Sequence, residues 1–290
     1  MNVIDVHLHF FERGDGNEGP IRPRVQQMMK DAGVALAIAM GSGRPEYKEN
    51  PPRVIEPLLP YMDEPLDLDN YNFLPNTAYC AGINPNGLCK ENLKASMDAF
   101  AKALKTDHCV GLKVYAGYQF FYVNDPIYHP FYELAEHYNV PVVIHTGDTA
   151  NPAAKVKYSH PLTVDDAAVD FPRVQFVMAH YGNPFIIEAT EVAKKNPNVS
   201  IDLSGMAVGE IGPEDFSARY GGYVQHLRTW MAYLDAYEKL MYGTDWPLAD
   251  MQSYLRLMQS IVPEQHHKAV FYENALRVFK KINPLLNQGE

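Results

Sequence analysis

Two histidines near the start of the chain have the spacing of metal ligands. The stretch IDVHLHFF, residues 4–11, places His7 and His9 two positions apart in an apolar run. Successive side chains of a β-strand point to opposite faces, so a strand here would project both histidines together and turn Val6 and Leu8 the other way. Two imidazoles within reach of one point suit a borderline metal such as zinc. They could equally hydrogen-bond to solvent or to loops, so this spacing alone leaves both interpretations open.

Further side chains that could do chemistry follow apolar, β-rich runs elsewhere in the chain. His145 lies in PVVIHTG, His180 in FVMAHYG, Asp245 in LMYGTDWP and Lys113 in VGLKVYAG. Imidazoles and carboxylates bind metals, and they also transfer protons to and from reacting groups. Whether these residues act together depends on the elements that position them.

Short β-rich runs alternate with amphipathic helical runs along the whole chain. We expect helices at residues 91–105, 126–139 and 183–196, where apolar residues recur at helical spacing or a proline suits the first turn. The predicted strands span 3–7, 35–40, 77–83, 109–115, 141–145, 174–180, 199–204 and 239–244. Eight such strand–helix units predict an α/β fold, a (β/α)8 TIM-like barrel that forms a single domain over residues 1–290. An open nucleotide-binding sheet is disfavoured, because no GxGxxG follows the first strand.

Two connections and the C-terminal segment stand out from this regular pattern. Residues 41–76 form a long inserted loop region after the second strand, and such loops often carry binding groups. Within the insertion, Arg44 could anchor an anion. Residues 116–126 form the second long connection, after the fourth strand. Together with Tyr115, its aromatic residues could wall an apolar pocket, cover the barrel or cover a subunit interface of a homo-oligomer. Residues 263–282 are predicted to form a closing C-terminal helix.

The carboxyl ends of the predicted strands gather the candidate chemical groups. Barrel enzymes build their sites at this end of the strands. Four of the eleven histidines (His7, His9, His145 and His180) fall there, together with Asp245. This constellation predicts a metal site. Asp202 and Ser204 share one face of the seventh predicted strand and could line its floor.

These motifs, in this order, resemble the amidohydrolase superfamily. The resemblance rests on HxH after the first strand, PVVIHTG, DFPRVQFVMAHYG, YGTDWP and the closing ENALRVF, and it covers about residues 3 to 280. Within the superfamily, the chain resembles the amidohydrolase-related group that includes the aminocarboxymuconate-semialdehyde decarboxylase family. The group contains both hydrolases and non-oxidative decarboxylases.

The resemblance implies a divalent metal and assigns a role to each residue. It implies that His7, His9, His145 and Asp245 hold the ion, that Asp245 also carries a proton, and that His180 acts as a catalytic or substrate-orienting group. We expect about one ion per chain, with zinc first and manganese second. A zinc-type ion at an open site lowers the pKa of its bound water to about 7.

Lys113 admits three interpretations. It could be carboxylated and bridge two metals, remain an ammonium that binds a substrate carboxylate, or extend to the rim of the barrel. We expect the second, with Lys113, Tyr115 and Arg44 binding substrate.

Composition limits the partners of the protein. The net charge of -10 disfavours nucleic acid and anionic membranes, and 47% hydrophobic with 21% charged residues is ordinary for a soluble globular protein. Three cysteines without a CxxC pair favour a reducing compartment. Since the chain starts directly on a strand with no signal-peptide pattern, we expect a cytoplasmic protein.

Three functions are compatible with these patterns. A metal-dependent hydrolase of a small ester, lactone or amide-like bond ranks first. A metal-dependent, non-oxidative decarboxylase of an aromatic or unsaturated carboxylate ranks second, and a catalytically silent barrel that serves as a binding module ranks last. The substrate is expected to be a small molecule, anionic or aromatic.

Overall fold

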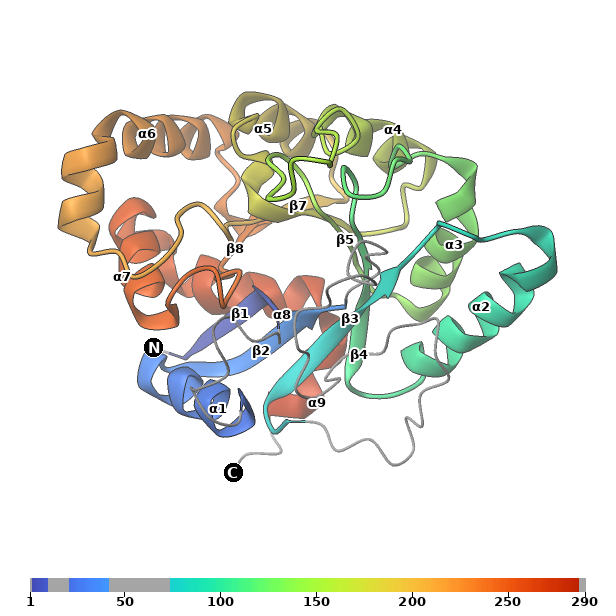
Figure 1. The fold of residues 1–290 in the computed structure, drawn as a ribbon. Coiled ribbons are helices and arrows are strands. Elements are labelled where there is room, and N and C mark those ends of the chain that lie inside the picture. Colours follow the sequence, from blue (N-terminus) through green and yellow to red (C-terminus); the bar gives the residue numbers. More distant parts are fainter. Residues whose placement is uncertain (1, 10–20, 42–73, 287–290) are drawn as a thin grey trace.

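Eight parallel strands form one sheet in sequence order, β1 to β8 (Figure 1). The computed structural model describes residues 2–9, 21–41 and 74–286. The strands are β1 Val3–Leu8, β2 Val34–Met40, β3 Thr77–Ile83, β4 Cys109–Val114, β5 Val142–Ile144, β6 Phe176–Met178, β7 Val199–Asp202 and β8 Leu240–Met241. Each overlaps a predicted strand, and the fold class expected from the sequence is confirmed.

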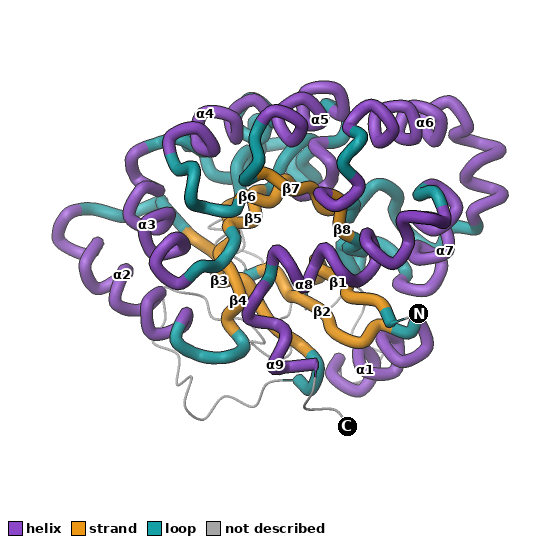
Figure 2. The backbone as a smooth tube through the Cα atoms, turned by 180° about the vertical axis from the view of Figure 1, so that it is seen from behind, coloured by secondary structure: helices purple, strands orange, loops and turns teal. Residues whose placement is uncertain are grey.

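The sheet closes on itself through the first and last strands. The Val6 amide donates to Tyr242 O at 3.0 Å, the Asp245 amide to His7 O at 2.7 Å and the His9 amide to Trp246 O. Figure 2 shows the strands as a ring with helices around it. The chain therefore forms a (β/α)8 barrel, and closure brings residues from its two ends together.

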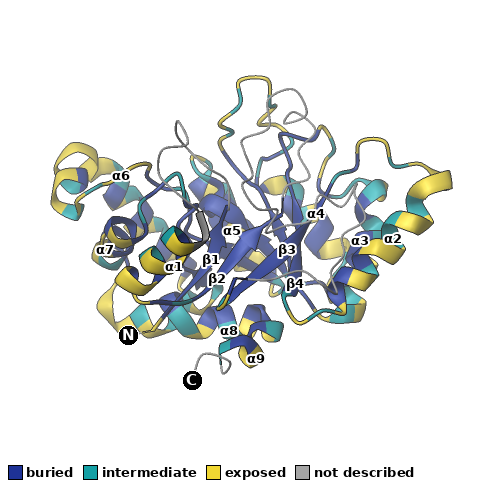
Figure 3. Cartoon of the chain, turned by 60° about the horizontal axis from the view of Figure 1, so that its bottom comes forward, coloured by how far each residue is buried: buried dark blue, intermediate teal, exposed yellow. Residues whose placement is uncertain are grey.

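Helices lie between the strands and after β8, and most of them cover the outside of the barrel (Figure 2). They are α1 Ile21–Ala32, α2 Lys90–Leu104, α3 His129–Tyr138, α4 Leu162–Asp170, α5 Ile186–Lys195, α6 Pro213–Leu234, α7 Met251–Ile261, α8 Asn274–Val278 and α9 Asn283–Leu286. Figure 3 shows buried strands inside a layer of helices whose outer faces are exposed. The helices expected at 91–105, 126–139 and 183–196 correspond to α2, α3 and α5, with a 3-10 turn at Pro126–Tyr128 ahead of α3.

The C-terminal segment closes the barrel in several short pieces. The sequence predicts one helix over 263–282, whereas the structure has 3-10 turns at Glu264–His266 and Lys280–Ile282, a π-helical turn at Ala269–Glu273, and α8 between them. The segment expected as one closing helix is therefore built from several short turns and one short α-helix.

Two apolar clusters divide the interior. One, inside the barrel, joins strand residues such as Ile4, Val143 and Met241 to Phe279 of the closing segment. The other lies between strands and helices. Strict alternation fails in β1, since Val6 belongs to the inner cluster and Leu8 to the outer one. The pairing of β1 with β2 shifts register between Asp5 and Leu8, which accounts for the change of face.

Some expectations fall outside these described ranges. Residues 42–73, which include Arg44 and most of the expected insertion, are not described. Within the described ranges, none of the helices has both the length and the apolar content that a bilayer crossing requires. The homo-oligomer and the cytoplasmic location stay predictions.

Candidate metal centre

Three of the predicted ligands converge where the first and last strands meet. Ligand atoms of His7, His9 and Asp245 all lie within 4.8 Å of one another. Oδ1 of Asp245 is 3.1 Å from Nε2 of His9 and 3.7 Å from Nε2 of His7. Two ligands of one tetrahedral zinc, each bound at 2.0–2.1 Å, would be about 3.3 Å apart. The spacing of these side chains therefore fits a single divalent ion.

Asp202 holds the His7 ring in an orientation suited to metal binding. Nδ1 of His7 donates to Oδ2 of Asp202 at 2.9 Å, and both side chains are fully buried. A neutral ring with its proton on Nδ1 presents a lone pair at Nε2. That Nε2 atom is buried and makes no hydrogen bond to any residue that the structure describes. A buried acceptor aimed at Asp245 is an independent indication of a cation site.

His145 lies beside this group but is joined to it through His180. Nε2 of His145 contacts Asp148 O at 2.9 Å, and since a carbonyl only accepts, Nε2 carries the proton. Nδ1 of His145 faces Nε2 of His180 at 3.1 Å. The ring centroid of His180 lies 4.8 Å from those of both His145 and His7. His145 thus turns a lone pair toward the site, and its role as fourth ligand stays a prediction.

His180 is itself within reach of a metal. Ligand atoms of His7, His180 and Asp202 form a second group within 4.8 Å. Nδ1 of His180 lies 3.0 Å from Oγ and 3.3 Å from O of Ser204, and the Ser204 hydroxyl makes a short hydrogen bond to Oδ1 of Asp202. Because that hydroxyl proton is directed to the carboxylate, Nδ1 of His180 is the donor and Nε2 bears the lone pair.

The backbone at the site is left-handed and closely packed. His180 and Asp245 both have φ of 63°, a conformation that few non-glycine residues adopt. Gly205, at φ +65°, lies between them: a Cβ there would be 2.9 Å from Nδ1 of His180 and 3.1 Å from Oδ2 of Asp245. Such strain is often concentrated at functional sites.

Burial and charge determine the protonation states of the site. Burial by itself would raise the pKa values of Asp202 and Asp245, but hydrogen bonds and neighbouring imidazoles outweigh it and hold both pKa values well below the usual range. Burial lowers the pKa of His7, and the Lys113 charge lowers it further. Burial likewise lowers the pKa of His180 to about 4. Near neutral pH the carboxylates are therefore ionised and these imidazoles neutral, which are the forms that bind metal.

Lys113 and two tyrosines form the adjoining wall. Lys113 is fully buried, which disfavours the interpretation that its side chain extends into solvent at the rim. Its Nζ lies 5.2 Å from the centroid of the Tyr115 ring, which is 6.5 Å from the His9 ring. Tyr118 packs edge-on against His145, with ring centroids 5.0 Å apart. A lysine side chain and aromatic rings thus lie next to the candidate ligands.

Sequence patterns missed three contributions to this site. Asp202 and Ser204 were expected on its floor, but not as hydrogen-bond partners of His7 and His180. Their shared face on the predicted strand 199–204, below the histidines at the strand ends, is the signal that points to such a role; in the structure β7 ends at Asp202 and Ser204 follows it. The close approach of Gly205 and the contact of Tyr118 with His145 depend on loop geometry, which no spacing rule provides.

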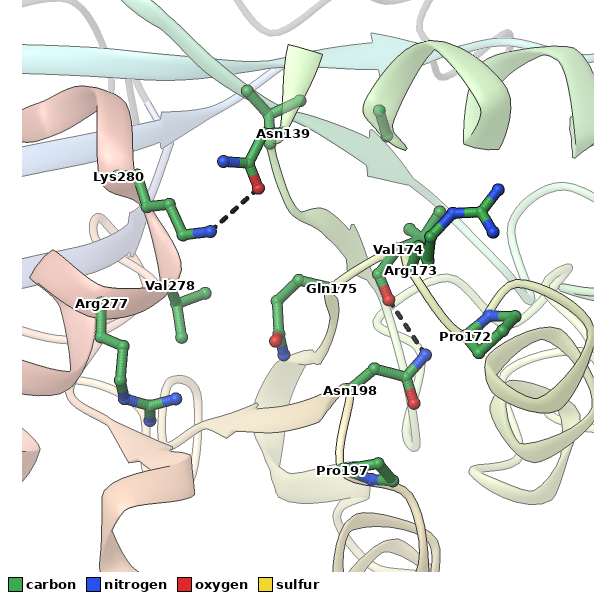
Figure 4. Close-up of a pocket in the computed structure, with 12 residues that line it drawn as sticks. Asn139, Pro172, Arg173, Val174, Gln175, Pro197, Asn198, Arg277, Val278 and Lys280 are labelled. Atoms are coloured by element: carbon green, nitrogen blue, oxygen red, sulfur yellow. Dashed lines mark hydrogen bonds between the residues drawn. The ribbon is translucent and has the colours of Figure 1, made fainter. Parts of the chain in front are cut away.

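A separate cavity of about 300 Å³ lies at the other end of the barrel, where β5, β6 and β7 begin (Figure 4). Arg173, Arg277 and Lys280 line it. Arg173 and Arg277 donate to Glu136 and to Glu238 O, which do not line the cavity, whereas Lys280 donates to Asn139, which does (Figure 4). It is remote in the fold from the candidate ligands, which follow the carboxyl ends of the strands.

Comparison with known proteins agrees with this architecture. A sequence model of the amidohydrolase family matches residues 4–281. No curated protein resembles the chain closely enough in sequence to match it.

Several solved structures share the fold at low sequence identity. A 2,6-dihydroxybenzoate decarboxylase in complex with 2,6-dihydroxybenzoate is 15% identical, with a TM-score of 0.64 over 96% of this chain and 98% of that one. The 5-carboxyvanillate decarboxylase of Novosphingobium aromaticivorans, with manganese and 4-hydroxy-3-methoxy-5-nitrobenzoic acid, is 13% identical, with a TM-score of 0.63 over 96% of each chain. Amidohydrolase 2 of Bifidobacterium longum subsp. infantis is 13% identical, with a TM-score of 0.55 over 96% of this chain and 98% of that one.

Proposed function

Because this chain belongs to the amidohydrolase family, an enzyme family, we propose that it is a metal-dependent decarboxylase of a small aromatic carboxylate. One observation carries the choice of substrate: Lys113, a buried cation, lies beside Tyr115 next to His7 and His9. An ammonium in this position can bind a carboxylate, and the tyrosine rings can pack against an aromatic ring. Related folds include decarboxylases of 2,6-dihydroxybenzoate and 5-carboxyvanillate, which supports the same substrate class.

We assign the metal to His7, His9, His145 and Asp245. The fit rests on the buried lone pair of His7 and on the 3.1 Å and 3.7 Å separations from Oδ1 of Asp245. When bound, a divalent ion would supply Lewis-acid polarisation of substrate oxygens. Zinc is expected first from the nitrogen-rich donor set, and the manganese of one related fold makes manganese the alternative.

The remaining chemistry belongs to the protein. Decarboxylation breaks the bond between a ring carbon and its carboxylate, CO2 leaves, and the electron pair stays on the ring carbon. That carbon needs one proton, which ultimately comes from solvent. Asp245 and His180 are the titratable groups placed to carry it, while Lys113 holds the anion and Tyr115 and Tyr118 limit access of water to the ring.

Hydrolysis is the second candidate, and a specific observation favours it. Asp245 is ionised and lies beside His9, so it has a free carboxylate and no proton of its own to donate to a ring carbon. A base of this kind suits attack of water on an ester or lactone. Hydrolysis, which ranked first from the sequence, is therefore proposed as the second candidate, after decarboxylation.

Product analysis separates the two reactions. Protein loaded with Zn²⁺ or Mn²⁺ would be incubated with hydroxybenzoates and, separately, with small lactones and esters. We expect CO2 release and, in D2O, one deuterium at the vacated ring carbon. If lactones or esters released acid and the carboxylates released no CO2, hydrolysis would replace decarboxylation as the proposed reaction. If neither the carboxylates nor the lactones and esters were consumed, the catalytically silent barrel would be favoured.

A further inference from the structure

We propose that Asp202 is a positioning residue that sets the tautomer of His7 directly and holds the ring of His180 through Ser204. It would thereby direct one nitrogen lone pair of each imidazole into the metal centre. The proposal deepens the assignment of the metal site and rests on it for its functional meaning.

The carboxylate of Asp202 joins three parts of the barrel. Its Oδ1 atom accepts the backbone N–H of Ser204 at 3.0 Å and that of His180 at 3.2 Å, as well as the Ser204 hydroxyl. Its Oδ2 atom faces Nδ1 of His7 at 2.9 Å. Asp202 is fully buried, so these contacts replace water. One side chain at the end of β7 therefore fixes one group within β1 and another that follows β6.

The two histidines depend on Asp202 in different ways. For His7, the partner is Oδ2 of Asp202, which can only accept a hydrogen bond, so the ring proton lies on Nδ1. Nε2 of His7 is then left with a lone pair that faces Asp245. For His180, the hydroxyl of Ser204 points at Asp202, so it accepts from Nδ1. Nε2 of His180 then faces Nδ1 of His145 with a lone pair. Two lone pairs 3.1 Å apart are favourable only with a cation or a proton between them.

Replacing Asp202 by asparagine should reverse the His7 tautomer without changing the shape of the side chain. The two backbone N–H groups at Oδ1 can only donate, so the amide oxygen of asparagine must stay there. The amide NH2 then faces Nδ1 of His7 and donates to it. His7 would carry its proton on Nε2, where the metal should bind.

Asp5 offers a matched control. It is also a fully buried carboxylate, and its Oδ1 accepts the backbone N–H of His7 at 3.1 Å and of Thr244 at 3.0 Å. Its Oδ2 faces the Thr244 hydroxyl, which can rotate and accept instead of donating. Burial raises the pKa of Asp5 to about 7, so the two substitutions differ in charge. Asp5→Asn nevertheless makes the same exchange of a buried carboxyl oxygen for an amide NH2, and it does so without touching an imidazole ring.

The test uses the full chain, first without metal. In ¹⁵N-histidine-labelled protein, ring nitrogen shifts report the tautomer, and His7→Gln and His180→Gln variants identify the two residues. We expect Nδ1–H for both in the wild type, a switch of His7 to Nε2–H in Asp202→Asn, and no switch in Asp5→Asn. Ser204→Ala should leave the His7 signals unchanged and speed exchange of the His180 Nδ1 proton with solvent.

Zinc affinity, measured by competition with a chromophoric chelator, gives a second readout. We expect Asp202→Asn to weaken binding about tenfold or more, and Asp5→Asn to bind as the wild type does. Two results would overturn the proposal: a wild type in which His7 is protonated on Nε2, or a zinc affinity of Asp202→Asn equal to that of the wild type. The first result is obtained on the wild type alone, so it does not depend on whether the variant folds. A wild type with the expected tautomers that binds no metal would reject the metal site while leaving the role of Asp202 intact.

Discussion

Nε2 of His9 lies 3.1 Å from Oδ1 of Asp245, although the two residues come from opposite ends of the barrel sequence. The amide of Asp245 also donates to His7 O at 2.7 Å, so the two strand ends are tied through the backbone beside the ligand atoms. Barrel closure therefore brings these candidate ligands together.

We predict about one tightly bound divalent ion per chain, which His7→Ala combined with His9→Ala should remove. Loss of two ligands on the same strand leaves Asp245 and His145 as the remaining assigned ligands. Elemental analysis of protein purified without chelator measures the result. The matched control is His137→Ala with His226→Ala, whose side chains lie on helices α3 and α6, and it should retain the metal. Wild-type metal content in the first double variant would rule out this assignment.

Asp245→Asn should lower turnover by about 10²-fold or more while the protein stays folded. The magnitude is that of a positioned acid or base. Asparagine suits the backbone here, because it tolerates the left-handed φ of 63° better than most residues. Steady-state kinetics on the substrate found in the product screen, with circular dichroism for folding, measures both effects. Turnover close to the wild-type value would remove Asp245 from the mechanism.

Lys113→Met should raise KM for a carboxylate substrate about tenfold to a hundredfold, the scale of one hydrogen bond to a charged group. Metal content should stay at its wild-type value, because the uncarboxylated lysine is not a ligand. Kinetics and elemental analysis of the same preparation measure the two quantities. Two ions per chain, lost on this substitution and restored by added short-chain carboxylate, would instead indicate a carboxylated, bridging Lys113.

Gly205→Ala should weaken metal binding and destabilise the fold. Its Cβ would meet His180 and Asp245 at 2.9 Å and 3.1 Å, and its φ of +65° is unfavourable for alanine by about 1–2 kcal/mol. Gly209→Ala is the matched control, because Gly209 has φ of +91° but no atom of the described residues lies within 4 Å of the added Cβ. Thermal melting and zinc competition compare the variants. Equal zinc affinity in both would show that crowding at Gly205 does not matter.

Lys281→Met should destabilise the fold by about 1.5–3 kcal/mol, the scale of hydrogen bonding to a charged group. Its Nζ donates to Leu104 O, Thr106 O and Cys109 O, which ties the closing segment to the loop before β4. Its neighbour Lys280 is exposed and donates only to Asn139 among the described residues, so Lys280→Met should cost little. Urea unfolding of both variants tests this, and similar losses would contradict the assigned role of Lys281.

The sequence by itself determined the barrel and most of its candidate site. Alternating β-rich and amphipathic runs have periods that the backbone imposes, and titratable residues at the ends of the strand runs fall on one rim of any parallel barrel. His7, His9 and Asp245 could be grouped on that basis alone, and the structure places their ligand atoms within 4.8 Å.

Tertiary structure decided what spacing cannot encode. Val6 and Leu8 were expected on the same face of β1, but they lie on different faces because β1 shifts register against β2. Register is a property of the strand pair rather than of either strand. The ring protons of His7 and His180 are set by Asp202 and Ser204, which lie far away in the sequence and meet them only in the closed barrel. Likewise, Gly205 is required by the atoms opposite it. Side-chain type and period are local properties, whereas tautomer, crowding and ligand separation depend on distances between strands, which only the folded chain determines.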